Sequence, residues 1–413
     1  MRKNKFSLLL ASVTLLSVII CWTAVQPHSQ AAQPNRRPAM NNPASAAANE
    51  FGFALFDQLH RQAAGKNVFL SPLSIATALT MAYNGAAGTT QQAMARTLKF
   101  GGTSLNDLNQ ANAELLAQLK GADPKIELTV ANSLWARRGV RFKEDFLARN
   151  RQFFQAEVTA LDFASPTALN TINGWVNQNT KGKIPKIIDR INGQQVLFLI
   201  NAVYFKGQWQ KRFDAKLTRN EPFHLLGGQQ KQLPMMSQAG TYQYLRSEKF
   251  QAVSLPYGQG GASLYLFLPD ANTSLAEFLK GLNYQNWQQW LGSFRSTPGD
   301  VKLPRFKLDY ESNLNNALKA LGMEIAFQTG RADFSGMRAE RDLFISEVLH
   351  KAVAEVNEEG TEASAATSVG MSVTSMRPVQ QRFNFVADRP FLMAICNQQT
   401  GAILFLGAVL DPK

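Results

Sequence analysis

The sequence has 413 residues, of which 45% are hydrophobic and 18% are charged. It can therefore bury a large core, and its composition excludes a disordered protein. The formal net charge is +13, but no dense run of Lys and Arg is present, so we expect a solvated basic face and no nucleic-acid binding.

The first 32 residues have the pattern of a secretory signal peptide. Basic residues at positions 2, 3 and 5 precede an apolar run over residues 6–25, and the small residues that end at Ala32 suit a cleavage site. The alternative is an uncleaved membrane anchor, because the run approaches the length of a spanning helix. We expect residues 1–32 to be removed and the protein to be secreted, to an extracellular or periplasmic location, without further membrane contact.

Residues 33–47 are rich in Pro, Asn and Ala and predict a flexible linker. No comparable stretch and no internal repeat follow, so we expect residues 48–413 to form one domain. The sequence has two cysteines, one of them in the leader, so the mature chain has no disulfide available. Cys396 follows an apolar run and is expected to be a buried structural thiol.

Helical spacing of apolar residues begins the domain. Ser71 followed by Pro72 is a good start signal for a helix that reaches about Tyr83. Helices are expected at residues 51–59, 72–83, 104–120, 170–179 and 311–322.

Strand patterns dominate later in the chain. Residues 196–205 are almost continuously apolar, as in a strand that is buried on both faces. Shorter strands are expected at residues 253–255, 264–268, 343–345 and 403–406. Helices come mainly first and strands mainly later, which predicts the α+β class.

The motifs of common hydrolases are absent from the sequence. It has no His-Glu-x-x-His, no Gly-x-Ser-x-Gly, no Walker loop and no paired cysteines, and its acidic residues are scattered. We therefore expect no catalytic residue, no metal and no cofactor. A triad assembled from residues far apart in the sequence is the alternative that remains open.

One stretch, residues 357–377, is rich in Ala, Ser and Thr and has no Pro between Glu358 and Arg377. Loops of this length in a compact domain are uncommon, and a flexible surface loop is the simple interpretation. With a period of two, however, one face carries only small and apolar residues, namely Thr361, Ala363, Ala365, Thr367, Val369 and Met371. Without Pro, every N–H is available to a central ladder, so this loop could also become a strand.

At this point the sequence resembles the serpin family over nearly all of residues 48–413. Residues 358–367 match the hinge of inhibitory members closely, and further matches follow in the family's order at residues 67–75, 172–176, 182–184, 201–209 and 388–392. The chain looks like a secreted bacterial member. The resemblance implies three β-sheets, eight or nine helices and an exposed reactive-centre loop at about residues 358–380.

The resemblance also implies a function, that of an irreversible suicide-substrate inhibitor of serine endopeptidases rather than an enzyme. A peptidase cuts the loop and forms an acyl-enzyme, and the freed loop then inserts into the large sheet and traps it. We expect a monomer, with cysteine peptidases as further candidate targets. The alternative is a non-inhibitory serpin fold, such as a binding or chaperone protein, but such relatives usually carry Pro or charge in the hinge.

The scissile bond follows from the usual distance after the hinge glycine, which gives Thr374 with Ser375 after the cut. A small Thr suits elastase- or subtilisin-like peptidases. The stretch up to Pro390 is a little longer than in many relatives, so Met376, for chymotrypsin-like targets, and Arg377, for trypsin-like targets, are alternatives. Pro follows Arg377, which weakens that choice.

Three groups of supporting residues are implied by the same resemblance. The hinge comprises Glu358, Gly360, Thr361, Ala363, Ala365 and Thr367. A polar cluster beneath the opening sheet, the shutter, comprises Ser71, Ser74, Asn201 and His350. At the top of the sheet, the breach comprises Trp209, Arg305 and Glu358.

Each of these groups has a simpler interpretation. The two serines of the shutter also suit helix capping, and its histidine suits a satisfied core position. In the breach, Glu358 could pair with Arg305, and a surface pair would contribute little. By the same resemblance, the helix that binds heparin in some vertebrate serpins should lie near residues 104–120. Here that helix has Lys120 as its only basic residue, so we do not expect activation by a polyanion.

Overall fold

The computed structural model describes residues 42–121, 123–192, 194–361 and 382–413. The chain divides into two units, residues 1–36 and 37–413, and every described residue belongs to the second. The expected signal peptide, residues 1–32, lies outside the described residues. Helix α1 begins at Pro43, inside the stretch expected to be a linker, because the side chain of Asn42 caps it by accepting the N–H groups of Ala44 and Ser45.

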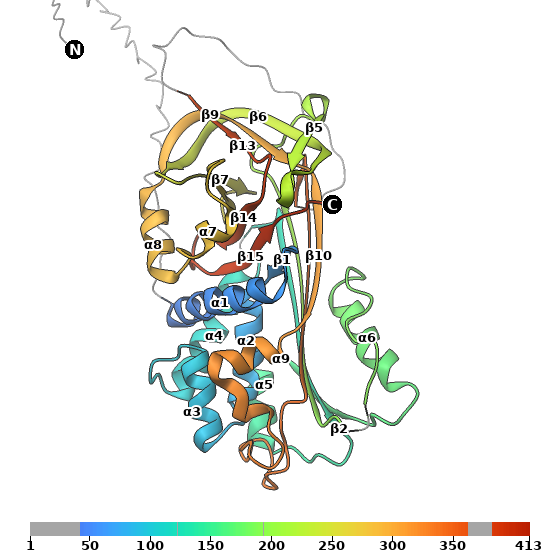
Figure 1. Ribbon diagram of the computed structural model, residues 1–413. Helices are drawn as coiled ribbons and strands as arrows, with labels where there is room; N and C mark the ends of the chain where they lie inside the picture. The colour runs from blue at the N-terminus through green and yellow to red at the C-terminus, as the bar shows by residue number, and fades with distance from the viewer. Residues whose placement is uncertain (1–41, 122, 193, 362–381) are drawn as a thin grey trace, which may run out of the picture. The chain divides into compact units, whose positions relative to one another are not determined.

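A six-stranded sheet has the strand order β10-β11-β12-β4-β2-β3 (Figure 1). Its strands are β2 (Ile126–Arg137), β3 (Glu157–Leu161), β4 (Leu197–Gln208), β10 (Phe306–Asn313), β11 (Glu347–Asn357) and β12 (Gly360–Thr361). Most neighbours are antiparallel, but β4 and β11 pair in parallel. A strand placed between these two can therefore be antiparallel to both.

A nine-stranded sheet contains the remaining strands. They are β1 (Val68–Leu70), β5 (Arg219–His224), β6 (Gln230–Arg246), β7 (Phe250–Tyr257), β8 (Ala262–Pro269), β9 (Arg295–Pro304), β13 (Phe383–Val386), β14 (Phe391–Asn397) and β15 (Ile403–Val409). The long strand β6 pairs with β5 and β9 along most of its length and with β7 near its end. Hydrogen bonds thus join the second and third of the three expected sheets into one.

Nine α-helices lie within the described residues, and the α+β class is confirmed. They are α1 (Pro43–Gln62), α2 (Pro72–Tyr83), α3 (Gly88–Thr97), α4 (Leu105–Leu119), α5 (Glu144–Phe154), α6 (Ala168–Asn179), α7 (Leu275–Leu279), α8 (Tyr284–Ser293) and α9 (Asn315–Leu318). Figure 1 shows α6 on one side of the six-stranded sheet and the group of α1 to α5 on the other.

The two faces of β4 are covered by two separate cores, as its continuous apolar sequence predicts. On one face, Ile172 and Val176 of α6 pack in a small cluster with Phe198 and Ile200 of β4. The opposite face contributes Leu199 to the main core. Each buried core stabilises the sheet through the apolar area that it removes from water.

Two expected elements are wrong in their bounds or their nature. Leu343 and Ile345 are buried but residues 343–345 form no strand, because the N–H of Ile345 donates to the carbonyl of Ala326 in a 3-10 helix. The helix expected over 311–322 starts only at Asn315, since β10 continues to Asn313 and pairs there with β11.

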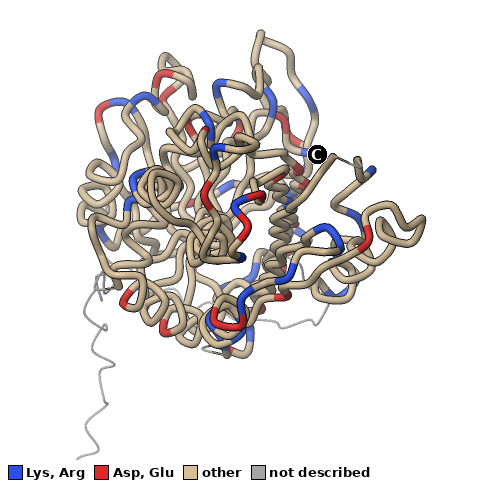
Figure 2. Tube along the Cα trace, turned by 90° about the horizontal axis from the view of Figure 1, so that it is seen from below, with Lys and Arg blue, Asp and Glu red and all other residues tan. Residues whose placement is uncertain are grey.

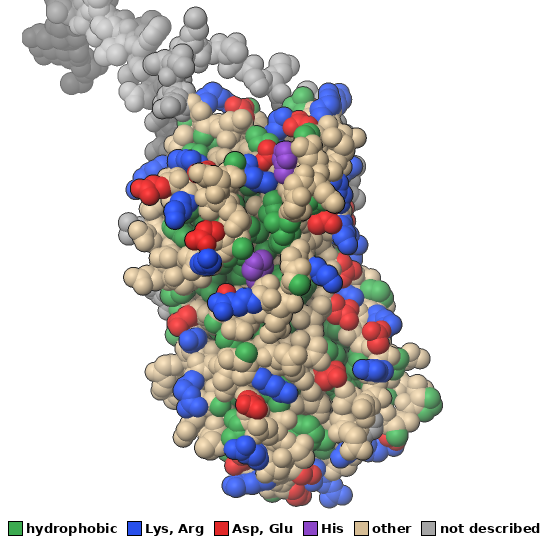
Figure 3. All heavy atoms as spheres, viewed as in Figure 1, with side chains coloured by type: hydrophobic (Ala, Val, Ile, Leu, Met, Phe, Trp, Pro, Cys, Tyr) green, Lys and Arg blue, Asp and Glu red, His purple; other side chains and the backbone are tan. Residues whose placement is uncertain are grey.

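Charges of both signs are interspersed along the chain. Figure 2 shows Lys and Arg alternating with Asp and Glu, and Figure 3 shows small hydrophobic areas between charged side chains on one face. Within the described ranges, no helix is both long and apolar enough to cross a membrane. Cys396 is buried and has no disulfide partner, and burial raises the pKa of its thiol.

Candidate functional site

The centre of the six-stranded sheet is the place where β4 and β11 meet. Seven residue pairs join the two strands in parallel, over Phe198 to Tyr204 of β4. Beyond these pairs, Gly360 and Thr361 of β12 lie between the same two strands and pair antiparallel with both. The sheet therefore already holds two residues in the line that a further central strand would follow.

The turn that precedes β12 is fixed by hydrogen bonds on both of its sides. The Oδ1 atom of Asn357 accepts the N–H groups of Glu359 and Gly360, at 3.0 and 3.2 Å. From the other side, the indole N–H of Trp209 donates to the carbonyl of Asn357 at 2.8 Å, and its backbone N–H donates to the carbonyl of Glu359. Trp209, expected at the breach, thus holds the turn that leads into the loop.

Only a glycine fits at position 360. A Cβ atom there would lie 2.0 Å from the carbonyl oxygen of Gly207 on β4. The next residue, Thr361, is fully buried, and its hydroxyl lies 2.7 Å from the hydroxyl of Tyr257, whose ring stacks on Trp209. Burial raises the pKa of Tyr257, so this is a hydrogen bond between neutral groups.

Glu358 lies beside Arg305, as the sequence suggested, at 3.7 Å between Oε1 and Nη1. The arginine side chain is 52% exposed and the glutamate 12%, so the ion pair alone contributes little. A second bond, from the Thr218 hydroxyl to the same Oε1 at 2.8 Å, was not predicted. The backbone N–H of Phe213 also donates to the carbonyl of Glu358. Three contacts therefore fix the residue from which the hinge starts.

The structure brings the four expected shutter residues together beneath this junction. Nδ1 of His350 lies 2.6 Å from Oδ1 of Asn201, and Nε2 of His350 accepts the backbone N–H of Ser71 at 3.3 Å. The amide of Asn201 donates to the hydroxyl of Ser74 and to Oδ1 of Asn132. All five residues are buried.

This hydrogen-bond pattern fixes the state of the histidine. Nδ1 must carry the proton to donate to Asn201, and Nε2 must be free to accept from Ser71. Burial lowers the pKa of His350 to about 3. The imidazole is therefore neutral at physiological pH.

The cluster lies on the ladder that joins β4 to β11. His350 is directly opposite Asn201 in the parallel register, and Asn132 of β2 is opposite Asn201 on the other side. Hydrogen bonds between these side chains thus cross three neighbouring strands. Ser71 also caps α2 by accepting the N–H of Ser74 at 3.4 Å, so capping and membership of the cluster coexist.

Sequence reasoning missed three residues of this region: Asn132, Thr218 and Tyr257. Asn132 had a signal, since an amide within the apolar run of β2 needs a buried partner. Thr218 and Tyr257 had none, because their partners lie more than a hundred residues away along the chain. The remaining hinge and scissile-bond candidates lie outside the described residues: Ala363, Ala365, Thr367, Thr374, Ser375, Met376 and Arg377.

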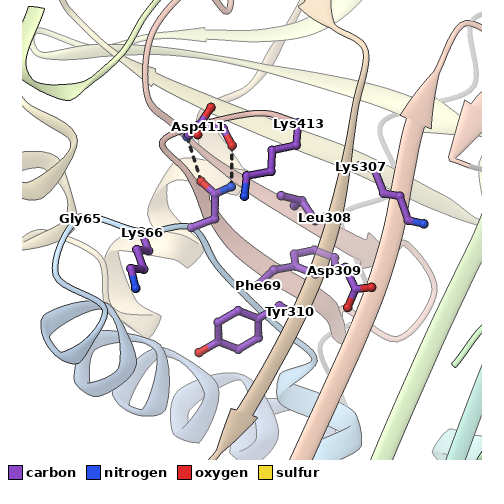
Figure 4. A pocket seen from close by; sticks show the side chains of 10 residues that line it. Gly65, Lys66, Phe69, Lys307, Leu308, Asp309, Tyr310, Asp411 and Lys413 are labelled. Carbon is purple, nitrogen blue, oxygen red and sulfur yellow. Dashed lines mark hydrogen bonds between the residues drawn. The ribbon is translucent and has the colours of Figure 1, made fainter. Parts of the chain in front are cut away.

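A cavity of 710 Å³ lies apart from this junction, between the turn after α1, the outer edge of β10 and the last residues of the chain (Figure 4). Asn67 closes one wall by bonding to the backbone of Asp411. The acidic residues that line the cavity have partners: Asp411 pairs with Lys231, and Asp309 lies 3.8 Å from Lys351. In the part of the chain that is described, no cluster of His, Cys, Asp and Glu could hold a metal.

In this sheet, the start of a loop lies between two parallel central strands. This arrangement is that of a class of proteins whose sheet can accept a further strand. A family model described as "Serpin (serine protease inhibitor)" matches residues 46–412. The chain belongs to the serpin family, and so to a family of protease inhibitors rather than of enzymes.

Individual relatives match over nearly their whole length. The leukocyte elastase inhibitor of Xenopus tropicalis is 36% identical over 89% of this chain and 99% of its own. Human serpin B8 is 37% identical over 88% and 97%. Among solved structures, the thermophilic serpin tengpin in its native state has a TM-score of 0.81 at 30% identity, covering 89% of this chain and 94% of tengpin. Human thyroxine-binding globulin has a TM-score of 0.83 at 28% identity, over 90% and 99%.

The comparisons overturn the expected location. The relatives include leukocyte elastase inhibitors and human serpins B8 and B9, which are intracellular serpins without signal peptides, and this finding contradicts the expected secretion. The prediction of a secreted, extracellular or periplasmic protein was based on the basic and apolar pattern of the first 25 residues. That stretch precedes the residues that the family model matches.

We predict that the unfolding free energy falls as the pH is lowered from about 6.5 toward about 3. The pKa of His350 is lowered in the folded state, so the unfolded chain takes up the proton first, at a loss of about 1.4 kcal/mol per pH unit for this group. In the variant His350→Gln this part of the slope disappears. Urea midpoints between about pH 7 and pH 4 measure it.

The exposed His224 provides the matched control. His224→Gln should keep the pH slope of the parent protein. An unchanged slope in His350→Gln would contradict a neutral, buried imidazole at the shutter.

Proposed function

We propose that this chain is an irreversible suicide-substrate inhibitor of serine endopeptidases, and that the inhibitory unit is the serpin domain that we placed at residues 48–413. The observation that carries the proposal is β12. Gly360 and Thr361 already lie between β4 and β11, antiparallel to both. The name of the leukocyte elastase inhibitors supports a peptidase of this kind as the partner.

The trap works by converting a loop into a strand. The serine of the peptidase attacks the carbonyl carbon of Thr374, the bond to the nitrogen of Ser375 breaks, and an ester to the peptidase remains. The freed segment then continues the line of β12 between β4 and β11. The bound peptidase is carried along and distorted before water can hydrolyse the ester.

The face that enters the sheet is fixed by Thr361. Its side chain is fully buried against Tyr257. Because side chains alternate along a strand, Ala363, Ala365 and Thr367 would follow on the same buried face. All three are small and uncharged, so insertion buries no charge on that side.

The energy of insertion is sufficient for an irreversible step. The seven parallel pairs between β4 and β11 are exchanged for two antiparallel ladders, one on each side of the new strand. A strand of about a dozen residues adds roughly ten ladder hydrogen bonds at about 1 kcal/mol net each. The sum is similar to the whole stability of a domain, about 5–15 kcal/mol.

The finer assignments are part of the proposal. The targets are elastase- or subtilisin-like, because the small Thr374 suits a shallow pocket, and cysteine peptidases are further candidates. The inhibitor acts as a monomer and needs no cofactor. Glu358, held by Thr218 and Arg305, is the fixed pivot about which the hinge turns.

We predict that a pancreatic-type elastase or a subtilisin forms a complex with this protein that survives SDS. The loop-cleaved protein should also melt at a temperature higher by tens of degrees than the intact one, because the cleaved loop adds a central strand. Gel electrophoresis and calorimetry measure the two effects. Cleavage without a stable complex and without a rise in melting temperature would indicate a non-inhibitory serpin.

The substitution Ala365→Asp should convert the inhibitor into a substrate. A carboxylate on the buried face would cost several kcal/mol if it stays unpaired, so insertion is slower than hydrolysis of the acyl-enzyme. The stoichiometry of inhibition should rise at least tenfold. Ala366→Asp, on the opposite face of the same strand, is the matched control and should behave like the parent; equal effects of the two substitutions would refute the face assignment.

Mass spectrometry of the small C-terminal fragment released by elastase identifies the scissile bond. We expect the fragment to begin at Ser375. A fragment that begins at Arg377 or Pro378 would move the reactive residue to Met376 or Arg377. If Thr374 is the reactive residue, the substitution Thr374→Arg should redirect the inhibitor to trypsin; otherwise it should not.

A further inference from the structure

An exposed segment precedes and begins β5. It consists of the short 3-10 helix Ala215–Leu217, Thr218 and Arg219. The side chain of Leu217 is 53% exposed, and Leu217 and Leu226 are the two large hydrophobic residues that are exposed in the described ranges. A single exposed leucine is ordinary by itself, so its significance depends on the charges and the fixed backbone around it.

Three exposed cations lie within six residues of this leucine along the chain. Lys211, Lys216 and Arg219 are exposed, and the ion pairs of the described residues include none of them. The guanidinium of Arg219 donates to the backbone carbonyls of Lys216 and Thr218, and the ammonium of Lys211 donates to the carbonyl of Ala239. These bonds leave their positive charges uncompensated.

The acidic groups nearby are mostly occupied. Glu358 lies beside Arg305, Glu359 beside Arg212, and Glu221 beside Lys302. Asp214 remains, and its Oδ1 accepts the N–H of Lys216 at the start of the 3-10 helix. Three cations against one carboxylate give this surface a positive excess.

The segment does not move independently of the hinge. The hydroxyl of Thr218 donates to Glu358 at 2.8 Å, and the N–H of Phe213 donates to the carbonyl of Glu358. Leu217 and Arg219 are therefore held at a fixed place beside the turn that leads into the loop. A rigid apolar group with charged neighbours is what a specific contact requires.

This place lies within reach of a peptidase engaged on the loop. Ser375 is seven residues before Arg382, where the described chain resumes at β13, so the proposed scissile bond lies within about 25 Å of that point. β5 is three strand spacings, roughly 15 Å, from β13 across β9 and β6, and Arg219 is also offset from Phe383 by about five residues along the strands, which makes the separation roughly 20 Å. A peptidase body is larger than either distance, so it would cover this end of the sheet.

We infer that Lys211, Lys216, Leu217 and Arg219 form a second contact surface for the target peptidase, which we call the β5 surface. The inference rests on the proposed function. The partner that fits is a peptidase with acidic side chains around an apolar spot beside its active-site cleft. Complementary charge steers the encounter and raises the association rate, while the chemistry of the trap stays unchanged.

The test compares the variant Lys216→Gln/Arg219→Gln with the parent protein. The probe is pancreatic elastase whose lysine amines have been succinylated to carboxylates, with unmodified elastase beside it. At about 50 mM salt we expect the second-order rate of inhibition of the acidic elastase to fall ~5-fold, and at about 0.5 M salt less than ~2-fold, because salt screens the charges. Leu217→Ser should lower the rate at both salt concentrations.

The matched control removes two exposed cations from helices at the far end of the sheet, Arg96 of α3 and Arg151 of α5 (Figure 1). Arg96→Gln/Arg151→Gln should leave the rate within ~1.5-fold of the parent. Equal losses in both pairs, or no loss in the first pair, would refute the β5 surface. If Lys216→Gln/Arg219→Gln inhibited at the rate of the parent and differed from it only in binding heparin, these residues would serve a polyanion, and the β5 surface would be refuted as well.

The stoichiometry of inhibition separates the two proposals. It should stay at the parental value in every one of these variants, because none touches the inserting strand. If SDS-resistant complexes form at unchanged rates, the β5 surface is wrong and the inhibitor remains. If no complex forms with any protein, the proposed function itself fails.

Discussion

The seven parallel residue pairs between β4 and β11 close the centre of the six-stranded sheet, and the other features of the site are arranged around them. Parallel pairing is slightly weaker per residue than antiparallel pairing. Beyond one end of these pairs, β12 lies between the two strands. The centre of the sheet is therefore closed by the weaker kind of ladder next to the two residues of β12, which pair antiparallel with both strands.

The polar cluster at this ladder differs from the packed cores on either side. A jigsaw of apolar side chains resists separation as a unit, whereas hydrogen bonds between Asn132, Asn201 and His350 can be exchanged for others one at a time. A neutral imidazole suits this role, because it carries no charge that would need a partner when the strands part. The same neutrality links the stability of the sheet to pH.

Much of this arrangement could be predicted from the sequence, but for different reasons. Period and composition identified β4 and α2, since both are continuous in sequence, and resemblance to a family supplied the hinge, the shutter and the breach. Apolar patterns gave wrong elements where tertiary contacts determine the secondary structure. Residues 343–345 are apolar yet have no neighbouring strand, and β10 continues through the start of an expected helix. Thr218 and Tyr257 were missed because only the fold brings them to the hinge. The apolar leader suggested a location that the relatives contradict.

Helix α6 gives the sheet a mechanical property of its own. Its small core spans β2, β4 and β11, including Ala131, Phe198 and Leu349, and is separate from the main core. One extra strand would widen the sheet by about 4.8 Å. The helix would then have to shift across the sheet or move away from it. Besides the parallel ladder and the polar cluster, the apolar contacts of α6 are thus a third set of interactions that must rearrange if the sheet opens.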